Sequence, residues 1–163
     1  MKPKVLWIED FALIDLQNWP AAVYVTGRHD LQIALDASDA LRHLKKSEYD
    51  AVVVDIQIPP GNDDAWKKLY NQLGHNKATS RLGLHLLYSL LNPENAKVEV
   101  KPIPNWISSD RFGLLTIESR RNHEQDLKNL KIAVFREKTA EMPSTALLEV
   151  IEEILAKRGS GLA

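Results

Sequence analysis

The chain has 163 residues and a mass of 18.4 kDa, the size of one domain. It contains no cysteine, and its 21 basic and 22 acidic residues give a net charge of −1. These values exclude disulfide frameworks and cysteine-ligated zinc, and they argue against the basic surface of a dedicated nucleic-acid-binding protein. With 44% hydrophobic and 26% charged residues, the chain is expected to fold rather than remain disordered.

We expect no export signal at the N-terminus, because only the four apolar residues 5–8 precede Glu9 and Asp10. No apolar run approaches the ~20 residues that a membrane-spanning helix needs. We therefore expect a soluble cytoplasmic protein that contacts neither membrane nor nucleic acid directly.

Strand-like and helix-like segments alternate, which favours a parallel sheet flanked by helices. Residues 5–8 form an apolar first strand, and a helix follows from about residue 11. Pro20 makes the stretch 19–27 ambiguous, because proline lacks the amide proton of a helix interior. A second strand is expected at 31–35.

The strongest strand pattern is the β-branched run 51–58, which we place at the centre of the sheet. The remaining elements follow in chain order: a helix capped by Asp36 or Ser38, a helix at about 80–91, a strand at 112–117, a helical segment at 121–130, a strand at 132–135 and a final helix with Pro143 in its first turn. Residues 62–79 and 92–111 are insertions into this rhythm. We expect one domain at 1–157 and a flexible tail at 158–163.

Three acidic residues stand where apolar strands end. Glu9 and Asp10 close the first strand, and Asp55 lies within or at the end of the run 51–58. Ligands of open parallel sheets bind at the carboxyl ends of the strands, and a buried carboxylate without a partner is costly. If the two strands are neighbours, the carboxylates converge, and Mg²⁺ is a natural partner because it prefers oxygen ligands.

Two later strand ends bring further polar groups to the same edge. Lys138, three residues after Phe135, can supply a positive charge. Ser119, just past the strand at 112–117, can supply a hydroxyl, with Thr116 as the rival position.

With these residues the sequence resembles the response-regulator receiver domain of two-component signalling. The matching segments are 4–10, 49–59, the helix start at 83–87 and 135–138. The resemblance implies a flavodoxin-like, doubly wound α/β fold. Its five-stranded parallel sheet would have the order 2-1-3-4-5, with helices on both faces.

The resemblance also implies a phosphorylation site. Asp55 would be the phosphoacceptor, and Mg²⁺ would be held by Glu9, Asp10, Asp55 and the main-chain carbonyl of Gln57. The phosphodonor would be a histidine kinase or a small acyl phosphate.

Other residues take supporting roles by the same resemblance. Lys138 would pair with a phosphoryl oxygen, Ser119 or Thr116 would donate a hydrogen bond to another, and Phe135 would be the aromatic residue whose rotation reports phosphorylation. The family usually has proline after its lysine, whereas Thr139 stands there in this chain.

The function expected from the resemblance is that of a stand-alone signalling domain, with no activity beyond its own phosphorylation and dephosphorylation. We expect no output domain after residue 163, so that it would act through an effector protein or through homodimerisation. The first alternative is a phosphorylation-independent pseudo-receiver that binds partners through its insertions. Thr139 and the insertion at 62–79, which contains Asp63, Asp64 and Trp66 and borders the pocket, motivate it.

The second alternative is a Mg²⁺-dependent phosphoryl-transfer enzyme. A haloacid-dehalogenase-like phosphatase would need a second aspartate two residues after its nucleophile, which the segment 9–12 lacks. A Toprim-type nuclease would need an Asp-x-Asp pair, whereas Asp63 and Asp64 are adjacent. The interpretations without a functional site are that Glu9 and Asp10 cap a helix and that Lys138 is a solvated surface lysine.

Overall fold

The central sheet has five parallel strands in the order β2-β1-β3-β4-β5, which confirms the predicted topology. The computed structural model describes residues 1–161. The strands are β1 (Lys4–Ile8), β2 (Asp30–Ala34), β3 (Ala51–Val54), β4 (Phe112–Thr116) and β5 (Val134–Glu137). β1 and β3 are neighbours with Ile8 opposite Val54, so the residues after these two strands leave the sheet side by side.

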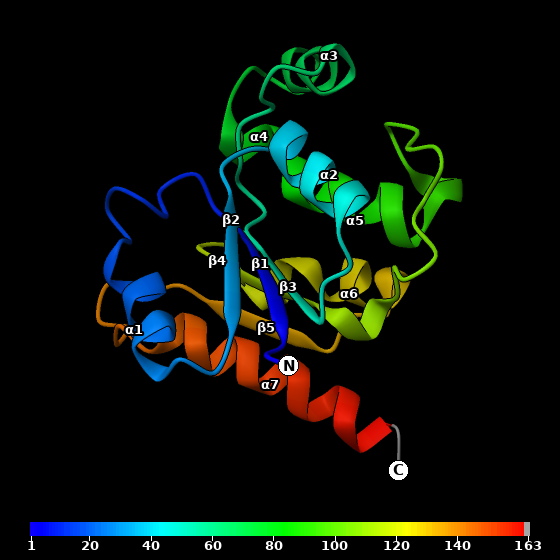
Figure 1. Cartoon of the computed structure of the whole chain (residues 1–163). Coiled ribbons are helices and arrows are strands. Elements are labelled where there is room, and N and C mark those ends of the chain that lie inside the picture. Colours follow the sequence, from blue (N-terminus) through cyan, green and yellow to red (C-terminus); the bar gives the residue numbers. More distant parts are fainter. Residues whose placement is uncertain (162–163) are drawn as a thin grey trace.

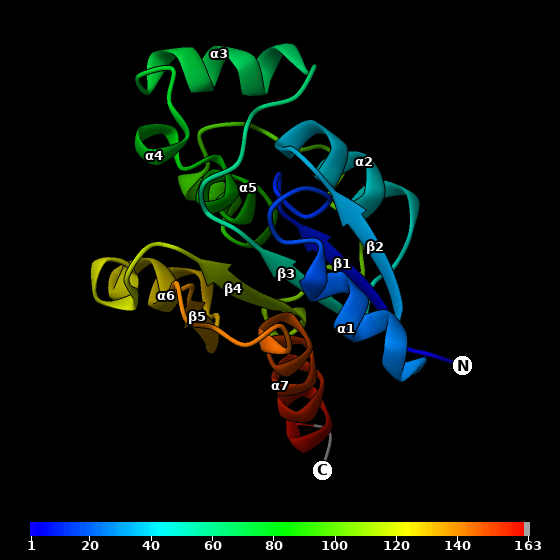
Figure 2. The ribbon, with the colours of Figure 1, turned by 90° about the vertical axis from the view of Figure 1, so that its left-hand side faces the viewer.

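Helices cover both faces of the sheet (Figure 1). On one face lie α1 (Asn18–Thr26) and α7 (Ala146–Gly161); on the other lie α2 (Ala37–Lys46), α5 (Leu82–Leu91) and α6 (Glu124–Leu130), as Figure 2 shows. Successive strand residues point to opposite faces, so Trp7 and Val53 join the core beneath α1 and α7, whereas Ile8 and Val54 join the core beneath the other helices.

The helix expected from about residue 11 begins only at Asn18 in α1, and residues 10–17 form turns. Pro20 explains the late start, because proline fits the first turn of a helix, where its missing amide proton has no partner to lose. The ambiguous stretch 19–27 is therefore α1 itself and its end. Gly27, with a φ of 64°, closes the helix in the left-handed conformation.

The expected strand at 51–58 is too long. β3 ends at Val54, and Asp55 is the first residue beyond it. Ile56 and Ile58 are nevertheless fully buried, because the loop after β3 packs beneath α2 and α5 and belongs to the same core as those helices. An apolar run can thus reflect a buried loop as well as a strand.

The two insertions carry short helices. The first holds α3 (Asp64–Gln72) and α4 (Lys77–Ser80), and the second holds the 3₁₀ helices η1 (Pro93–Asn95) and η2 (Ser109–Arg111). α3 lies beyond α2 and α5 on the side away from α7 (Figure 2), and it is fixed there by Trp66 and Leu69, which join the core. The helix expected from residue 80 starts at Leu82, because Arg81 has a left-handed φ of 48°.

The C-terminal segment differs from expectation at both ends. α7 begins at Ala146 rather than around Pro143, whose carbonyl instead accepts the amide of Ala146 in a preceding turn at 3.1 Å. The helix then continues through residues 158–161 of the expected tail, because a single glycine such as Gly159 costs a helix only about 1 kcal/mol. Residues 162–163 of that tail lie outside the described part. Within residues 1–161, no helix has the length and apolar character needed to cross a membrane.

Candidate functional site

The three predicted acids come together at the carboxyl edge of β1 and β3. Glu9 and Asp55 each extend their strand's pairing by one residue: the Glu9 amide donates to the Ala34 carbonyl at 2.9 Å, and the Asp55 amide donates to the Ile8 carbonyl at 3.1 Å. One carboxylate oxygen from each of Glu9, Asp10 and Asp55 lies within 4.8 Å of the others.

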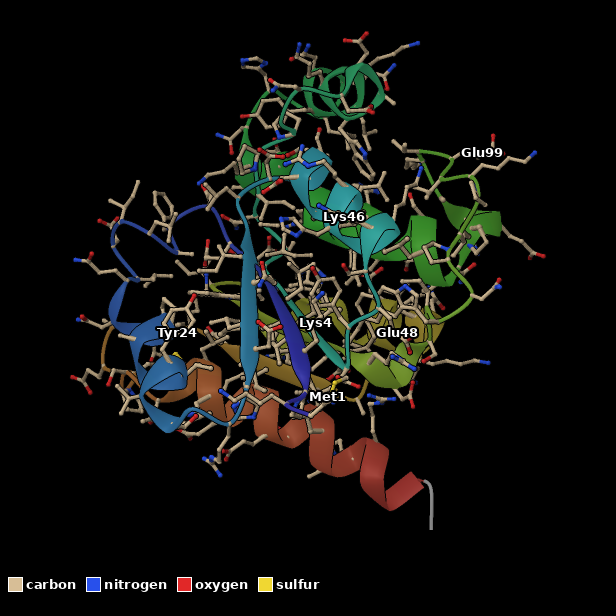
Figure 3. All side chains as sticks on the ribbon, in the orientation of Figure 1. Met1, Lys4, Tyr24, Lys46, Glu48 and Glu99 are labelled. Atoms are coloured by element: carbon tan, nitrogen blue, oxygen red, sulfur yellow. The ribbon has the colours of Figure 1, made fainter. Side chains whose placement is uncertain are left out.

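Two of these acids are buried, which is unusual for charged residues. Lys46, Glu48 and Glu99 are exposed, as is typical of charged side chains (Figure 3). In contrast, Glu9 is 0% exposed and Asp55 is 4% exposed. Because burying an uncompensated carboxylate costs several kcal/mol, these two acids need a partner.

Lys138 is that partner on one side of the site. Its ammonium group donates to Asp55 Oδ2 at 3.0 Å and also contacts Glu9 Oε1. The lysine follows β5, and its amide donates to the Thr116 carbonyl at 2.7 Å, which fixes its backbone at the sheet edge. The side chain therefore reaches Asp55 although Thr139 takes the place of the family's usual proline.

Burial and neighbouring charge set the protonation of this group. Burial and then the charge of Asp55 raise the pKa of Glu9 to about 8, against the opposing effect of the Lys138 ammonium. Burial lowers the pKa of Lys138, but the charges of Asp55 and Glu9 outweigh it and leave the pKa above its usual value. Burial thus favours the protonated form of Glu9, while the Lys138 ammonium is paired with Asp55.

A second lysine, which the sequence pattern does not indicate, neutralises the third acid. Lys77, from α4 of the first insertion, donates to Asp10 Oδ2 at 2.5 Å. Its ammonium also lies 4.2 Å from the centre of the Phe11 ring, a cation–π contact. The other oxygen, Asp10 Oδ1, is buried and has no hydrogen-bond partner within residues 1–161.

Gly83 determines how closely α5 approaches Asp55. The Gly83 amide donates to the Ile56 carbonyl at 3.0 Å, at the start of α5. A Cβ at this position would lie 1.9 Å from the carbonyl oxygen of Asp55, far inside van der Waals contact. The loop after β3 is held further by the Gln57 amide, which donates to Asp55 Oδ1 at 3.2 Å.

The two candidate hydroxyls occupy different places. Thr116 is fully buried and is the last residue of β4. The strand therefore ends one residue earlier than the expected 112–117. Thr116 is paired in register with Glu137, the residue before Lys138. Ser119 instead caps the 3₁₀ helix η3 (Arg120–His123) by accepting the Arg121 amide at 3.3 Å.

Phe135 lies on β5 and is half-buried against the core beneath α5 and α6. Its ring centre is 6.5 Å from that of His123, a buried histidine.

His123 belongs to a polar cluster beside the acidic site that sequence reasoning missed. Glu118 Oε1 lies 2.7 Å from His123 Nε2 and accepts a hydrogen bond from Arg81 Nε at 2.9 Å, while Glu118 Oε2 accepts one from the Gln57 side chain at 3.1 Å. On its other side, His123 Nδ1 is 3.0 Å from Asp126. The cluster joins the Asp55 loop to Arg81, between α4 and α5, and to α6.

Asp63, Asp64 and Trp66, in the insertion expected to border the pocket, do not contribute to the acidic site. Asp63 caps α3 by accepting the Ala65 amide at 2.9 Å, Asp64 is exposed in the first turn of that helix, and Trp66 is 1% exposed in the core. From this insertion, Lys77 is the residue that pairs with the acidic site.

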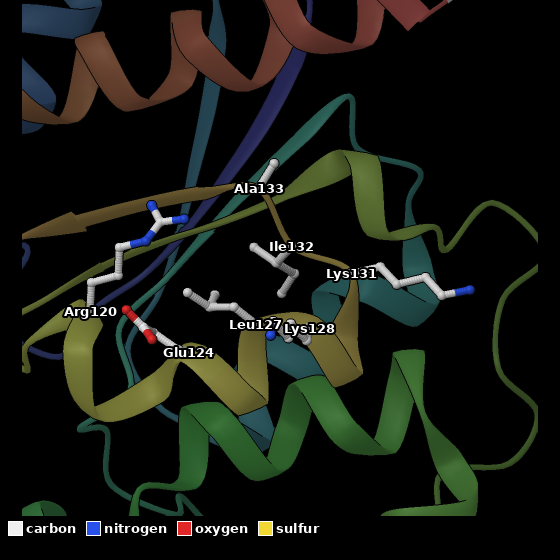
Figure 4. Close-up of a pocket in the computed structure, with 7 residues that line it drawn as sticks. All are labelled: Arg120, Glu124, Leu127, Lys128, Lys131, Ile132 and Ala133. Atoms are coloured by element: carbon white, nitrogen blue, oxygen red, sulfur yellow. The ribbon is translucent and has the colours of Figure 1, made fainter.

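The acidic site fits a hard divalent cation. Its donors are carboxylate oxygens, which Mg²⁺ prefers. One of them, Asp10 Oδ1, is buried without a hydrogen bond within residues 1–161, as expected of an oxygen whose partner is an ion. A separate cavity of about 360 Å³ beside α6 includes Arg120 and Lys131 but none of the three acids (Figure 4).

No protein-family model matches the sequence, and no curated protein matches it. In structure, the chain is similar to a CheY-like response regulator receiver domain from Methanospirillum hungatei, with a TM-score of 0.61 and 16% identity over 99% of both chains. It is also similar to the receiver domain of a Francisella response regulator, with a TM-score of 0.58 and 22% identity over 97% of this chain and 99% of that one.

A third similar structure is the receiver domain of a sensor histidine kinase from Pseudomonas aeruginosa, which has a magnesium ion coordinated in its active-site cleft. Its TM-score is 0.53 at 13% identity, over 96% of this chain and 99% of that one.

Sheet order, helix placement and the polar carboxyl edge define a doubly wound, flavodoxin-like α/β protein. More narrowly, the chain has the fold of CheY-like response-regulator receiver domains. The resemblance seen in the sequence is thereby confirmed for the fold.

Proposed function

We propose that the chain is a receiver-type signalling domain that is phosphorylated on Asp55 with the help of Mg²⁺. The observation that carries the proposal is the contact between the buried Asp55 carboxylate and the Lys138 ammonium, next to two further acids on a receiver fold. A buried carboxylate held by a cation at the carboxyl edge of a parallel sheet is suited to nucleophilic attack on phosphorus.

In the proposed reaction, an Asp55 oxygen attacks the phosphorus of an acyl phosphate or a phosphohistidine. The bond from phosphorus to the donor's oxygen or nitrogen breaks, and the donor leaves with that electron pair. Glu9, Asp10, Asp55 and the Gln57 carbonyl would hold the magnesium ion. When bound, the ion neutralises charge on the transferred phosphoryl group.

The other side of the pocket would neutralise and orient the same group. The Lys138 ammonium, already 3.0 Å from Asp55 Oδ2, is placed to pair with a phosphoryl oxygen. We assign the hydroxyl role to Thr116 rather than Ser119, because Thr116 ends β4 beside the backbone of Lys138, whereas Ser119 caps η3. Phe135, packed near His123, is the proposed aromatic reporter of phosphorylation.

The partners proposed for this site are a histidine kinase or a small phosphodonor, and a protein effector. The solved neighbours support this kind of partner: two are response-regulator receiver domains and one is the receiver domain of a sensor histidine kinase.

The test is intact-mass spectrometry after incubation with acetyl phosphate and Mg²⁺. We expect the wild-type chain to gain one phosphoryl group and to lose this gain when EDTA replaces Mg²⁺. Asp55→Asn should gain none, whereas the matched control Asp64→Asn, at an exposed position of α3, should behave as wild type. A wild type that gains no mass, or an Asp55→Asn variant that does, contradicts the proposal.

The second candidate is a phosphorylation-independent binding module. It is favoured by the Lys77–Asp10 pair, because the Lys77 ammonium already neutralises one of the acids that a metal ion would need. Beryllofluoride, a phosphoryl mimic, separates the two candidates when amide NMR shifts are followed with Mg²⁺ present. A receiver that still accepts phosphate should show shifts around Asp55 and Phe135, whereas the binding module should show none.

A further inference from the structure

The geometry points to Lys77 as a built-in competitor of the divalent cation. We infer that its ammonium occupies Asp10 Oδ2 when no metal is bound, that a metal ion on the neighbouring Oδ1 repels and displaces it, and that the first insertion thereby lowers the metal affinity of the site. This inference rests on the proposed function, because it concerns the metal site assigned there.

The contact between Lys77 and Asp10 is close and partly shielded from solvent. Lys77 Nζ is 2.5 Å from Asp10 Oδ2, and the two side chains are only 29% and 14% exposed, so solvent screens the pair less than it screens an ordinary surface ion pair. The Phe11 ring, 4.2 Å away, provides a second favourable contact for the ammonium.

The insertion holds Lys77 in this position from both sides. Before it, the Asn76 side chain accepts the Ala78 amide at 2.7 Å and starts α4. After it, Arg81 leaves α4 in a left-handed conformation and donates to Glu118 at 2.9 Å. Lys77 is thus directed at Asp10 by the fold of the insertion and differs from a freely moving surface lysine.

A divalent cation and this ammonium cannot share Asp10 without repulsion. One oxygen from each of Glu9, Asp10 and Asp55 lies within 4.8 Å of the others, so a cation held by these three acids would share the Asp10 carboxylate with the Lys77 ammonium on Oδ2. Linkage requires the effect to be mutual: if Lys77 weakens metal binding by a given factor, bound metal weakens the Lys77 contact by the same factor.

The first test is Mn²⁺ titration with the free ion followed by electron paramagnetic resonance. We expect Lys77→Gln to bind Mn²⁺ at least about fivefold more tightly than wild type, the lower end of typical coupling between sites. The matched control Lys68→Gln, which removes an exposed lysine of α3, should bind as wild type does. Equal or weaker binding by Lys77→Gln overturns the inference.

Two further measurements test whether the effect of Lys77 acts through Asp10. In an Asp10→Asn background, Lys77→Gln should give no additional tightening; the same tightening there would indicate a general charge effect and would overturn competition for Asp10. In the wild-type chain, saturating Mg²⁺ should speed acylation of the Lys77 amine by an amine-reactive ester relative to Lys68 in the same molecule. Unchanged Lys77 reactivity would contradict displacement.

The outcomes separate this inference from the proposed function. If neither wild type nor Lys77→Gln binds Mn²⁺, the metal site itself is wrong, and both proposals fail. If wild type binds Mn²⁺ and accepts phosphate while Lys77→Gln binds no more tightly, only the role of Lys77 fails. Circular dichroism of each variant checks that the fold is retained.

Discussion

Gly83 offers the sharpest test of how the fold positions Asp55. In Gly83→Ala the new Cβ would lie 1.9 Å from the Asp55 carbonyl oxygen and 2.9 Å from the Asp55 carbonyl carbon and the Ile56 Cα. All three are backbone atoms, so no side chain can rotate away. Restoring normal contact requires α5 and the loop after β3 to separate by more than about 1 Å.

The change in the free energy of unfolding follows from two destabilising contributions and one stabilising contribution. Overpacking of a rigid site costs about 1–3 kcal/mol, and the separation also breaks the hydrogen bond of 3.0 Å from the Gly83 amide to Ile56, which contributes about 1 kcal/mol. Alanine regains up to about 1 kcal/mol of helix propensity. We expect Gly83→Ala to lower the free energy of unfolding by about 1–3 kcal/mol.

Urea unfolding followed by tryptophan fluorescence measures this difference, and Gly159→Ala is the matched control. Gly159 also lies in a helix, but a Cβ there meets no atom within 4 Å, so the same substitution should leave the stability unchanged or raise it by up to about 1 kcal/mol. If Gly83→Ala is as stable as wild type, the close approach of α5 to Asp55 is not a constraint of the fold, and the reasoning fails.

Three further predictions concern the polar groups of the site. Lys138→Met leaves two buried acids without their cation and should lower the stability at pH 8 by about 3 kcal/mol, and by less at pH 5; equal losses in urea unfolding at the two pH values would contradict this. Folding raises the pKa of Glu9 from 4.5 to about 8, so the folded state binds a proton that the unfolded state has released. The free energy of unfolding should therefore fall as the pH rises from about 4.5 to about 8, and Glu9→Gln should flatten this slope. A wild-type stability that rises over this pH interval refutes the assignment. Thr116→Val should slow phosphorylation by acetyl phosphate, while Ser119→Ala should leave the rate unchanged and cost at most about 1 kcal/mol of stability; the reverse pattern would restore Ser119 to the site.

The sheet and the convergence of the acids were predictable because both depend on strong local patterns. The apolar segment before Glu9 and the β-branched run before Asp55 read as buried parallel strands, and neighbouring strands carry their following residues to the same edge. Lys138 was predictable for the same reason, since it follows a strand.

Element boundaries were less predictable, because apolar residues also serve loops and surfaces. Phe11, Leu13 and Ile14 suggest a helix directly after β1, yet all three are exposed in turns. Ile56 and Ile58 extend the strand pattern of β3, although both are buried in a loop. In each case the tertiary environment, which the local pattern does not contain, decides the structure.

Lys77 was not predictable, because nothing local marks it. It lies in an insertion of mixed polar residues and pairs with Asp10 across 67 positions in sequence. Only the packing of α3 and α4, anchored by the buried Trp66, determines where its side chain ends.

The first insertion and Arg81, which follows α4, join the site at two points. Lys77 pairs with Asp10, and four residues later Arg81 pairs with Glu118. Glu118 also accepts a hydrogen bond from Gln57, two residues after Asp55. A displacement of Lys77 that moves α4 would therefore also reach the Arg81–Glu118 pair. Since Glu118 also accepts the hydrogen bond of the Gln57 side chain, a change at that pair would reach the loop that follows Asp55.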